Sequence, residues 1–254
     1  MQIKGNIMTD DKQKIALLTG AAGVLGRETA RGLAADGYRV VLVDLDRKQL
    51  EALAQEIGQG AYPLPLDVAD PQKVAAACTT VRQELGQVSV LVNNAGVLSN
   101  NKAAETSDDE WRKVLSINLD GTFYLCREWL PGMKTERWGR IINVCSLAMK
   151  SGGITAGTAY TTSKGAMASL TFSLAREAAP HGVTVNGIAP AYIKTPMVTE
   201  QLTEEQRRQL IEQIPVGRFC EAEEVAHVVR FLVSPLSGFI TGEIIDINGG
   251  LHMD

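Results

Sequence analysis

The sequence has few cysteines and histidines, and neither kind is clustered. The four cysteines are Cys78, Cys126, Cys145 and Cys220, and the three histidines are His181, His227 and His252. No two cysteines have the spacing of a zinc knuckle or a CxxC redox pair, so we expect reduced and mostly buried thiols. The scattered histidines argue against a histidine-based metal site or triad, and we predict that no metal is bound.

Long apolar runs, aromatic residues and charge of one sign are also scarce. No run of about 18 apolar residues occurs, which argues against a membrane span. Aromatic residues make up 5% of the chain, too few for an evident platform on which bases would stack. The net charge is only −4, with both signs interspersed, so we expect neither nucleic acid nor a membrane surface as a partner.

The first residues, MQIKGNIMTDDKQK, are polar and lack the apolar centre of a signal peptide. We therefore expect a cytoplasmic protein with a flexible N-terminal tail over residues 1–13. Either Met1 or Met8 could be the start of the native chain.

Seven short apolar runs predict strands. They are apolar at consecutive positions, as in strands that helices cover on both faces. The runs are IALLT from Ile15, YRVVLVD from Tyr38, AYPLPLD from Ala61, VSVLVNN from Val88, GRIINVCS from Gly139, VTVNGIAP from Val183 and EIIDING from Glu243.

Segments of helical period separate these runs. Predicted helices cover residues 25–36, 46–57, 70–85, 158–179 and 203–214, and a long helix begins at Ser107 or Asp108. Alternation of strands and helices predicts an α/β protein, with a Rossmann-type, doubly wound parallel sheet of about seven strands. We expect a single domain over residues 14–254, in which residues 191–221 break the alternation and form a substrate lid.

A glycine-rich stretch, TGAAGVLG from Thr19, joins the first strand to the first helix. Glycines at such a junction let a pyrophosphate approach the backbone, and the helix N-terminus offers free N–H groups. A plain turn would show similar glycines, but the flanking strand and helix favour a dinucleotide site. The residues assigned to it are Gly20, Ala22, Val24, Leu25 and Gly26.

Asp44 follows the second strand, 18 residues after Gly26. A carboxylate there can accept hydrogen bonds from the ribose hydroxyls of an adenosine and would repel a 2′-phosphate. The nearest arginine, Arg47, falls inside the next predicted helix. We therefore predict that Asp44 and Leu45 contact the cofactor and that NAD is favoured over NADP. The alternative is that Asp44 only caps a helix.

Tyr160 and Lys164 lie one helical turn apart in YTTSK. A free tyrosine has a pKa of about 10, too high for a general base at neutral pH. A nearby cation stabilises the phenolate, so the pair can take a proton from an alcohol or return it to a carbonyl. Alone, such a pair usually means two surface residues.

Several further motifs occur in a characteristic order. They are LDV at Leu66, NNAG at Asn93, SINLDG around Asn118, NVCS around Ser146, IAPAYIKTPM at Ile188 and the ending IPVGRF…EEVA…FL…ITGEIIDINGG. Together with the glycine-rich stretch and YTTSK, this order resembles the short-chain dehydrogenase/reductase family over residues 13 to 251.

The resemblance implies a four-residue catalytic site. Tyr160 would be the general acid/base, and Lys164 would lower its pKa and hold the nicotinamide ribose. Ser146 would hydrogen-bond the substrate oxygen. Asn118 would hold a water that relays protons.

The resemblance also implies further contacts and an assembly. Cofactor contacts are expected at Asp67, Val68, Asn94, Ala95, Gly96, Pro190, Ile193 and Thr195, besides Tyr160 and Lys164. The family state is a homotetramer, whose contacts would come from the helices around Trp111 and Tyr160 and from the C-terminal strand.

The sequence departs from the family pattern in places. Val24, Ala191 and Cys220 stand where glycine is usual, and Ser146 and Tyr160 are one residue further apart than usual. We therefore expect the segment 147–158 to bulge over the substrate. Besides Ser146 and Tyr160, the residues predicted to contact substrate are Asn100, Lys150 and Tyr192. Lys150 and Lys194 suggest a substrate that carries an anionic group.

Three functions remain open from the sequence. The first is an NAD-dependent oxidoreductase that acts on a small secondary alcohol or ketone, such as a polyol, sugar or hydroxy acid. The second is an NADPH-dependent reductase of 3-oxoacyl thioesters, against which Asp44 argues. The third is a non-catalytic protein that senses dinucleotides on the same fold.

Overall fold

The computed structural model describes residues 13–58, 60–195 and 203–253. The predicted tail, apart from Gln13, and the segment 196–202 of the predicted lid lie outside the described residues.

The seven predicted strands form one parallel sheet in the order β3-β2-β1-β4-β5-β6-β7. This doubly wound order confirms the Rossmann-type fold. The strands are β1 (Ile15–Thr19), β2 (Arg39–Asp44), β3 (Ala61–Pro65), β4 (Val88–Asn93), β5 (Gly139–Val144), β6 (Val183–Pro190) and β7 (Ile244–Ile247).

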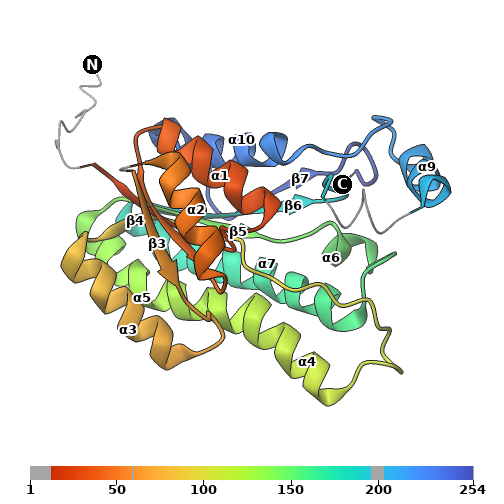
Figure 1. Cartoon of the computed structure of the whole chain (residues 1–254), viewed down its shortest axis with the longest axis horizontal. Helices are drawn as coiled ribbons and strands as arrows, with labels where there is room; N and C mark the ends of the chain where they lie inside the picture. The colour runs from red at the N-terminus through yellow and green to blue at the C-terminus, as the bar shows by residue number, and fades with distance from the viewer. Residues whose placement is uncertain (1–12, 59, 196–202, 254) are drawn as a thin grey trace.

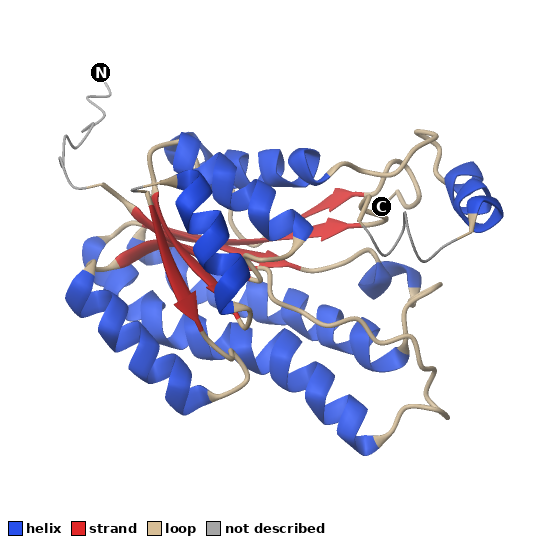
Figure 2. Cartoon of the chain, in the orientation of Figure 1, coloured by secondary structure: helices blue, strands red, loops and turns tan. Residues whose placement is uncertain are grey.

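Helices cover both faces of the sheet (Figures 1 and 2). On one face lie α1 (Val24–Ala35), α2 (Arg47–Ile57) and α10 (Ala222–Val233). On the other lie α3 (Pro71–Glu84), α4 (Asp108–Leu115), α5 (Gly121–Glu136) and α7 (Thr158–Ala178). The short α6 (Ala148–Ser151) follows β5, and α9 (Glu204–Gln213) stands apart at the right in Figure 1.

Two helix starts follow the predicted chemistry. The Asp70 side chain accepts hydrogen bonds from the backbone N–H groups of Gln72 and Lys73, with Pro71 at the first helical position. Ser107 caps α4 by accepting from the N–H of Glu110 at 3.2 Å. Each cap satisfies N–H groups that have no partner inside the helix.

The predicted long helix after Ser107 is divided. It consists of α4, one π-helical turn (Ser116–Asp120) and α5. The turn contains Asn118, which is fully buried. Since π-helical turns often occur at functional sites, this division bears on the site described below.

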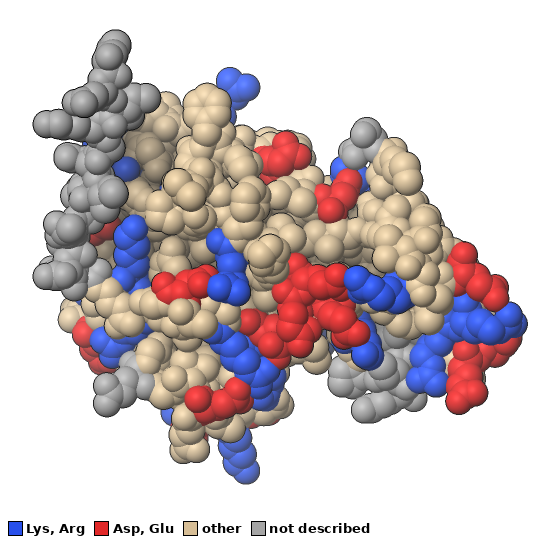
Figure 3. All heavy atoms as spheres, turned by 90° about the horizontal axis from the view of Figure 1, so that it is seen from above, with Lys and Arg blue, Asp and Glu red and all other residues tan. Residues whose placement is uncertain are grey.

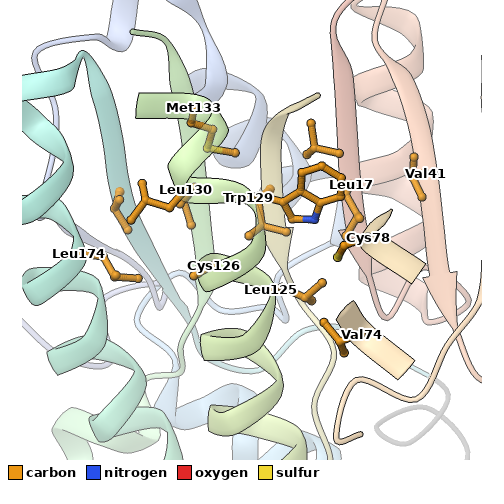
Figure 4. Close-up of a cluster of buried hydrophobic side chains, with 14 of the residues drawn as sticks. Leu17, Val41, Val74, Cys78, Leu125, Cys126, Trp129, Leu130, Met133 and Leu174 are labelled. Atoms are coloured by element: carbon orange, nitrogen blue, oxygen red, sulfur yellow. The ribbon is translucent and has the colours of Figure 1, made fainter. Parts of the chain in front are cut away.

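Consecutive apolar residues in each strand alternate between two cores. Val41 and Val43 of β2 pack with α3, α5 and α7 in one cluster, whereas Val40 and Leu42 pack with α1 and α10 in the other. In the first cluster, Leu125, Trp129 and Met133 follow one another at helical spacing along α5 (Figure 4). Burial on both faces of the central strands explains why neighbouring residues in them are apolar.

The surface carries charges of both signs. On the face seen from above in Figure 3, acidic and basic side chains lie beside one another. On α9, Arg208 pairs with Glu205 at 2.8 Å and with Glu212 at 2.7 Å. Among the described residues, no helix is long and apolar enough to cross a membrane.

Candidate active site

The glycine-rich turn between β1 and α1 is too tightly packed for side chains at two positions. A Cβ on Gly26 would lie 2.1 Å from the carbonyl oxygen of Gly20. Gly20 has a φ of +66°, and a Cβ there would lie 2.7 Å from Nδ2 of Asn94. No side chain caps α1 at Gly23 in the described part of the chain. The turn therefore fits a pyrophosphate that needs close backbone approach and free N–H groups.

Val24 opens α1 at the position where glycine is usual in the family. Gly23 just before it has a φ of −71°, which any residue adopts. Valine at position 24 begins the helix, where no left-handed backbone is required. The two crowded positions of the turn, Gly20 and Gly26, are still glycine.

Asp44 lies at the end of β2 beside this turn. Its Oδ2 accepts from the N–H of Ala22 at 3.0 Å, and its Oδ1 accepts from the N–H of Leu45 at 2.7 Å. The residue that caps α2 is Asp46, which accepts from the N–H of Gln49, so the alternative of Asp44 as a helix cap is wrong. A carboxylate has about four acceptor sites, which leaves capacity for ribose hydroxyls.

The loop after β4, residues 94–107, is attached to the glycine-rich turn between β1 and α1. Thr19 Oγ1 accepts from the N–H groups of Asn94 and Ala95, both at 2.9 Å. The Asn94 amide donates to the carbonyl oxygens of Thr19 and Gly20 at 3.0 and 3.1 Å. Asn94 therefore joins two loops at the carboxyl edge of the sheet, where α/β proteins bind dinucleotides.

The other predicted cofactor contacts lie along the same edge. Val68 is buried, and both its side chain and its carbonyl oxygen lie against Gly121, so contact of Val68 with an adenine stays a prediction. Asp67 Oδ1 accepts from the N–H of Ala69 at 3.0 Å. The carbonyl oxygen of Pro190 accepts from Leu147, and Ile193 bridges to Cys220.

Asn118 is held by three side-chain hydrogen bonds within the protein. Its Nδ2 donates to the carbonyl oxygen of Val97 at 3.1 Å and to Ser163 Oγ at 3.0 Å, and its Oδ1 accepts from the N–H of Val97 at 2.8 Å. The amide thus connects the π-helical turn, the loop after β4 and α7. Both amide hydrogens are engaged, so a relay water would use an oxygen of Asn118.

The Lys164 ammonium is buried and donates to the carbonyl oxygen of Val144 at 2.6 Å. Its Nζ lies 5.8 Å from the ring centroid of Tyr160. Burial lowers the pKa of Lys164 to about 8, since the charged form loses hydration.

Ser146 follows the end of β5, and Tyr160 lies in the first turn of α7. Burial raises the pKa of Tyr160, and a hydrogen bond with Ser146 offsets part of that rise. The sequence predicted that the pKa of Tyr160 is lowered. In the structure the groups of the protein raise it. The physical reason is that the loss of hydration outweighs the stabilisation of the phenolate.

The predicted substrate lysines are already paired with carboxylates. Lys150 Nζ lies 2.8 Å from Asp246 Oδ2, and Lys194 Nζ lies 2.9 Å from Glu221 Oε1. The expected preference for an anionic substrate was based on the positive charges of these two lysines, each of which is neutralised by a carboxylate of the protein. These ion pairs remove that support.

The two remaining residues predicted to contact substrate, Asn100 and Tyr192, follow different strands, β4 and β6. Asn100 is exposed on the loop after β4. Tyr192 stacks edge-on against Phe219 at 6.5 Å and lines a cavity with Ile214 and Arg218. None of Asn118, Ser146, Tyr160 and Lys164 lines that cavity, so contact of Tyr192 with substrate stays a prediction.

The segment 147–158 is held by a residue that the sequence did not indicate. This segment contains α6 and two successive glycines with φ of +72°. Lys102, from the loop after β4, donates to two carbonyl oxygens within it. A lone lysine in a loop gives no signal from which this contact could be predicted. Among the described residues, no three His, Cys, Asp or Glu side chains could hold a metal ion together.

We expect the free energy of unfolding of the wild type to rise with pH relative to that of Lys164→Met. The pKa of Lys164 is about 8 in the folded chain and has an ordinary value of 10.5. Between these values the unfolded chain binds a proton that the folded chain has released, which favours folding as pH rises. Urea unfolding of both proteins from about pH 7 to about pH 10 measures the difference. A difference that stays constant would contradict the lowered pKa.

The sheet order, the glycine-rich turn and the residues gathered at the carboxyl edge define a Rossmann-type dinucleotide-binding protein. A family model described as enoyl-(acyl carrier protein) reductase matches residues 20–252. The chain belongs to the short-chain dehydrogenase/reductase family and is an oxidoreductase with a nicotinamide cofactor.

Relatives align with nearly the whole chain. The 3-oxoacyl-(acyl-carrier-protein) reductase of Escherichia coli is 37% identical, and the alignment covers 94% of this chain and 98% of that protein. The enzyme of the same name from Aquifex aeolicus is also 37% identical, with 94% and 97% covered. A short-chain dehydrogenase/reductase from Brucella melitensis, described as a glucose/ribitol dehydrogenase, has a TM-score of 0.88 and 36% identity, with 96% and 98% covered.

Proposed function

We propose that the chain transfers a hydride between a nicotinamide cofactor and a secondary alcohol or ketone. The observation that supports this most is the buried Lys164 ammonium, whose Nζ lies 5.8 Å from the ring centroid of Tyr160. Ser146 lies close enough to the phenol to lower its pKa. A protein that only sensed dinucleotides would have little need for this arrangement.

The proposed roles follow from the chemistry of each group. When bound, the cofactor supplies or accepts the hydride at the carbon that bears the substrate oxygen. In the direction of reduction, Tyr160 Oη donates a proton to that oxygen, and Ser146 Oγ donates a hydrogen bond to it. Lys164 keeps a positive charge near the phenol while it is protonated, which stabilises the phenolate left behind. In the direction of oxidation, the phenolate takes the proton from the alcohol.

For the substrate, the relatives favour a 3-oxoacyl thioester over a small alcohol. Eight bacterial relatives, at 35–38% identity, carry the name 3-oxoacyl-(acyl-carrier-protein) reductase. A small polyol or sugar is the second candidate, favoured by the name of the Brucella protein. Assays of NAD(P)H absorbance with a 3-oxoacyl thioester, a 2-enoyl thioester, ribitol and glucose would rank them. Turnover of the enoyl thioester alone would overturn both candidates.

For the cofactor, we predict that NADH supports faster turnover than NADPH and that Asp44→Asn reduces this preference. The carboxylate would accept from ribose hydroxyls and repel a 2′-phosphate. Hydrogen bonds to charged groups contribute about 1.5–3 kcal/mol, so the ratio of kcat/KM for the two cofactors should fall about tenfold or more. Steady-state kinetics with each cofactor measures this ratio.

Asp46→Asn is the matched control for this prediction. It removes the same charge two residues away, and asparagine also caps helices well. We expect Asp46→Asn to leave the preference unchanged. An NADPH preference in the wild type would contradict the role proposed for Asp44.

A further inference from the structure

The first turn of α7 is held by another part of the chain. No side chain of α7 caps its N-terminus at Gly157. Instead, the N–H of Gly157 donates to the carbonyl oxygen of Ser99 at 2.6 Å, and the N–H of Thr158 donates to that of Asn101 at 3.0 Å. These bonds satisfy N–H groups that a helix start leaves open. The loop after β4 thus acts as the cap of α7, in which Tyr160 is the third residue.

The two segments touch closely at this junction. A Cβ on Gly157 would lie 2.5 Å from the carbonyl oxygen of Asn101. A Cβ on Gly153 would lie 2.2 Å from Thr161 Oγ1, a buried hydroxyl with no hydrogen-bond partner among the described residues. Little room remains for either segment to shift without moving the start of α7.

Lys102 fastens the junction. Its Nζ donates to the carbonyl oxygens of Gly153 and Ala156, both at 2.7 Å. One ammonium from the loop after β4 therefore bridges two carbonyls of the segment that leads from Ser146 to Tyr160. Such charge-assisted bonds are stronger than bonds between neutral groups.

Glu110 on α4 holds the other side of the same loop. Its carboxylate accepts from Ser99 Oγ and, at 2.7 Å, from Asn101 Nδ2. The residues whose carbonyls cap α7 are thus fixed from one side by Glu110. Lys102 fixes the segment before α7 to the same loop.

We propose that Lys102 is a positioning residue for the reaction at Tyr160, an inference that rests on the proposed function. Its ammonium keeps the loop after β4 and the segment before α7 in one arrangement. This arrangement fixes the first turn of α7 and hence the distance between Tyr160 and Ser146. The hydrogen bonds of Lys102 Nζ in the described part of the chain go to backbone carbonyl oxygens of the segment before α7, so Lys102 would act through the position of Tyr160.

The test compares Lys102→Met, Lys102→Arg and, as the matched control, Lys113→Met on the exposed face of α4. Because a displacement near 1 Å can cost about a hundredfold in rate, we expect Lys102→Met to lower kcat about tenfold or more. NADH affinity, read from the fluorescence of the bound cofactor, should stay within about twofold. Arginine offers donors for both carbonyls and should restore most of kcat, and Lys113→Met should match the wild type.

Hydrogen exchange at the amides of Gly157 and Thr158 reads the junction directly. In Lys102→Met both amides should exchange faster than in the wild type, while the amides in the middle of α7 keep their protection. An unchanged kcat, or a loss of kcat that arginine does not restore, would overturn the proposal. So would a loss of NADH affinity in parallel with kcat, which would indicate a general structural role.

The substrate panel and the hydrogen-exchange measurement test the proposed function and the role of Lys102 separately. If the wild type turned over none of the four substrates with either cofactor, the proposed function would fail. The exchange of the Gly157 and Thr158 amides would then still decide whether Lys102 holds the junction.

Discussion

Tyr160→Phe is expected to lower kcat by about 10²–10⁴-fold, the contribution of a positioned general acid–base group. Phenylalanine keeps the ring and removes the only atom that can exchange a proton with the substrate. Ser146, the residue expected to hold the substrate oxygen, lowers the pKa of this phenol, so the two side chains act on one another. The affinity for the reduced cofactor should change far less than kcat, because the ring remains in place.

Tyr62→Phe is the control for this variant. It also removes a hydrogen-bonded phenol hydroxyl, which donates to Glu84 at 2.7 Å on the outer strand β3. Pre-steady-state and steady-state rates of the two variants should be measured with the best substrate of the panel. If Tyr160→Phe retained the activity of the wild type, proton transfer through Tyr160 would be ruled out.

Lys164→Met is expected to lower kcat by about 10²–10³-fold, the range seen when an electrostatic group at a reacting centre is removed. Methionine fills similar space but offers no charge near Tyr160 and no donor for the carbonyl oxygen of Val144. The phenolate left after proton transfer then lacks a stabilising cation. In addition, cofactor affinity should fall, since Lys164 is expected to hold the nicotinamide ribose.

A double variant separates a coupled pair from two independent groups. If Tyr160 and Lys164 act as a unit, Tyr160→Phe with Lys164→Met should be about as slow as the slower single variant. Lys73→Met, on the exposed surface of α3, controls for the loss of a lysine. Losses of kcat that multiply in the double variant would show that the two residues act separately. Thermal unfolding of each variant shows whether the fold is kept.

The positions of the strands were predictable because burial on both faces produces a recognisable sequence pattern. Every residue of β1, β4, β5 and β6 is buried, so apolar residues stand at neighbouring positions in each strand and not only at alternate ones. Helix starts at Asp70 and Ser107 were predictable because a cap is local, and its donors lie two or three residues away. The π-helical turn at Asn118 was not, since its side-chain partners are Val97 and Ser163.

The candidate site divides in the same way. Tyr160 and Lys164 were found from sequence because helical geometry places them on one face and because the motifs around them occur in the order of a known family. The roles of other charged residues depended on partners far along the chain, as with Lys150 and Asp246, which are 96 residues apart. The pKa of Tyr160 likewise depends on burial, and burial cannot be predicted from the YTTSK motif alone.

The sequence by itself determined the seven strands, the glycine-rich turn and the spacing of Tyr160 and Lys164, because each depends on residues close together in the chain. Ser146 and Asn118 were candidates only through the order of motifs that resembles a known family. Only the tertiary structure decided that Asp44 accepts from the N–H of Ala22, that Lys150 and Lys194 pair with carboxylates, and what holds the first turn of α7. The physical reason is that hydrogen bonds and ion pairs between loops form only after the sheet has brought distant segments to one edge. The loop that carries Lys102 caps a helix that begins more than 50 residues later, and no local pattern in the chain specifies that contact.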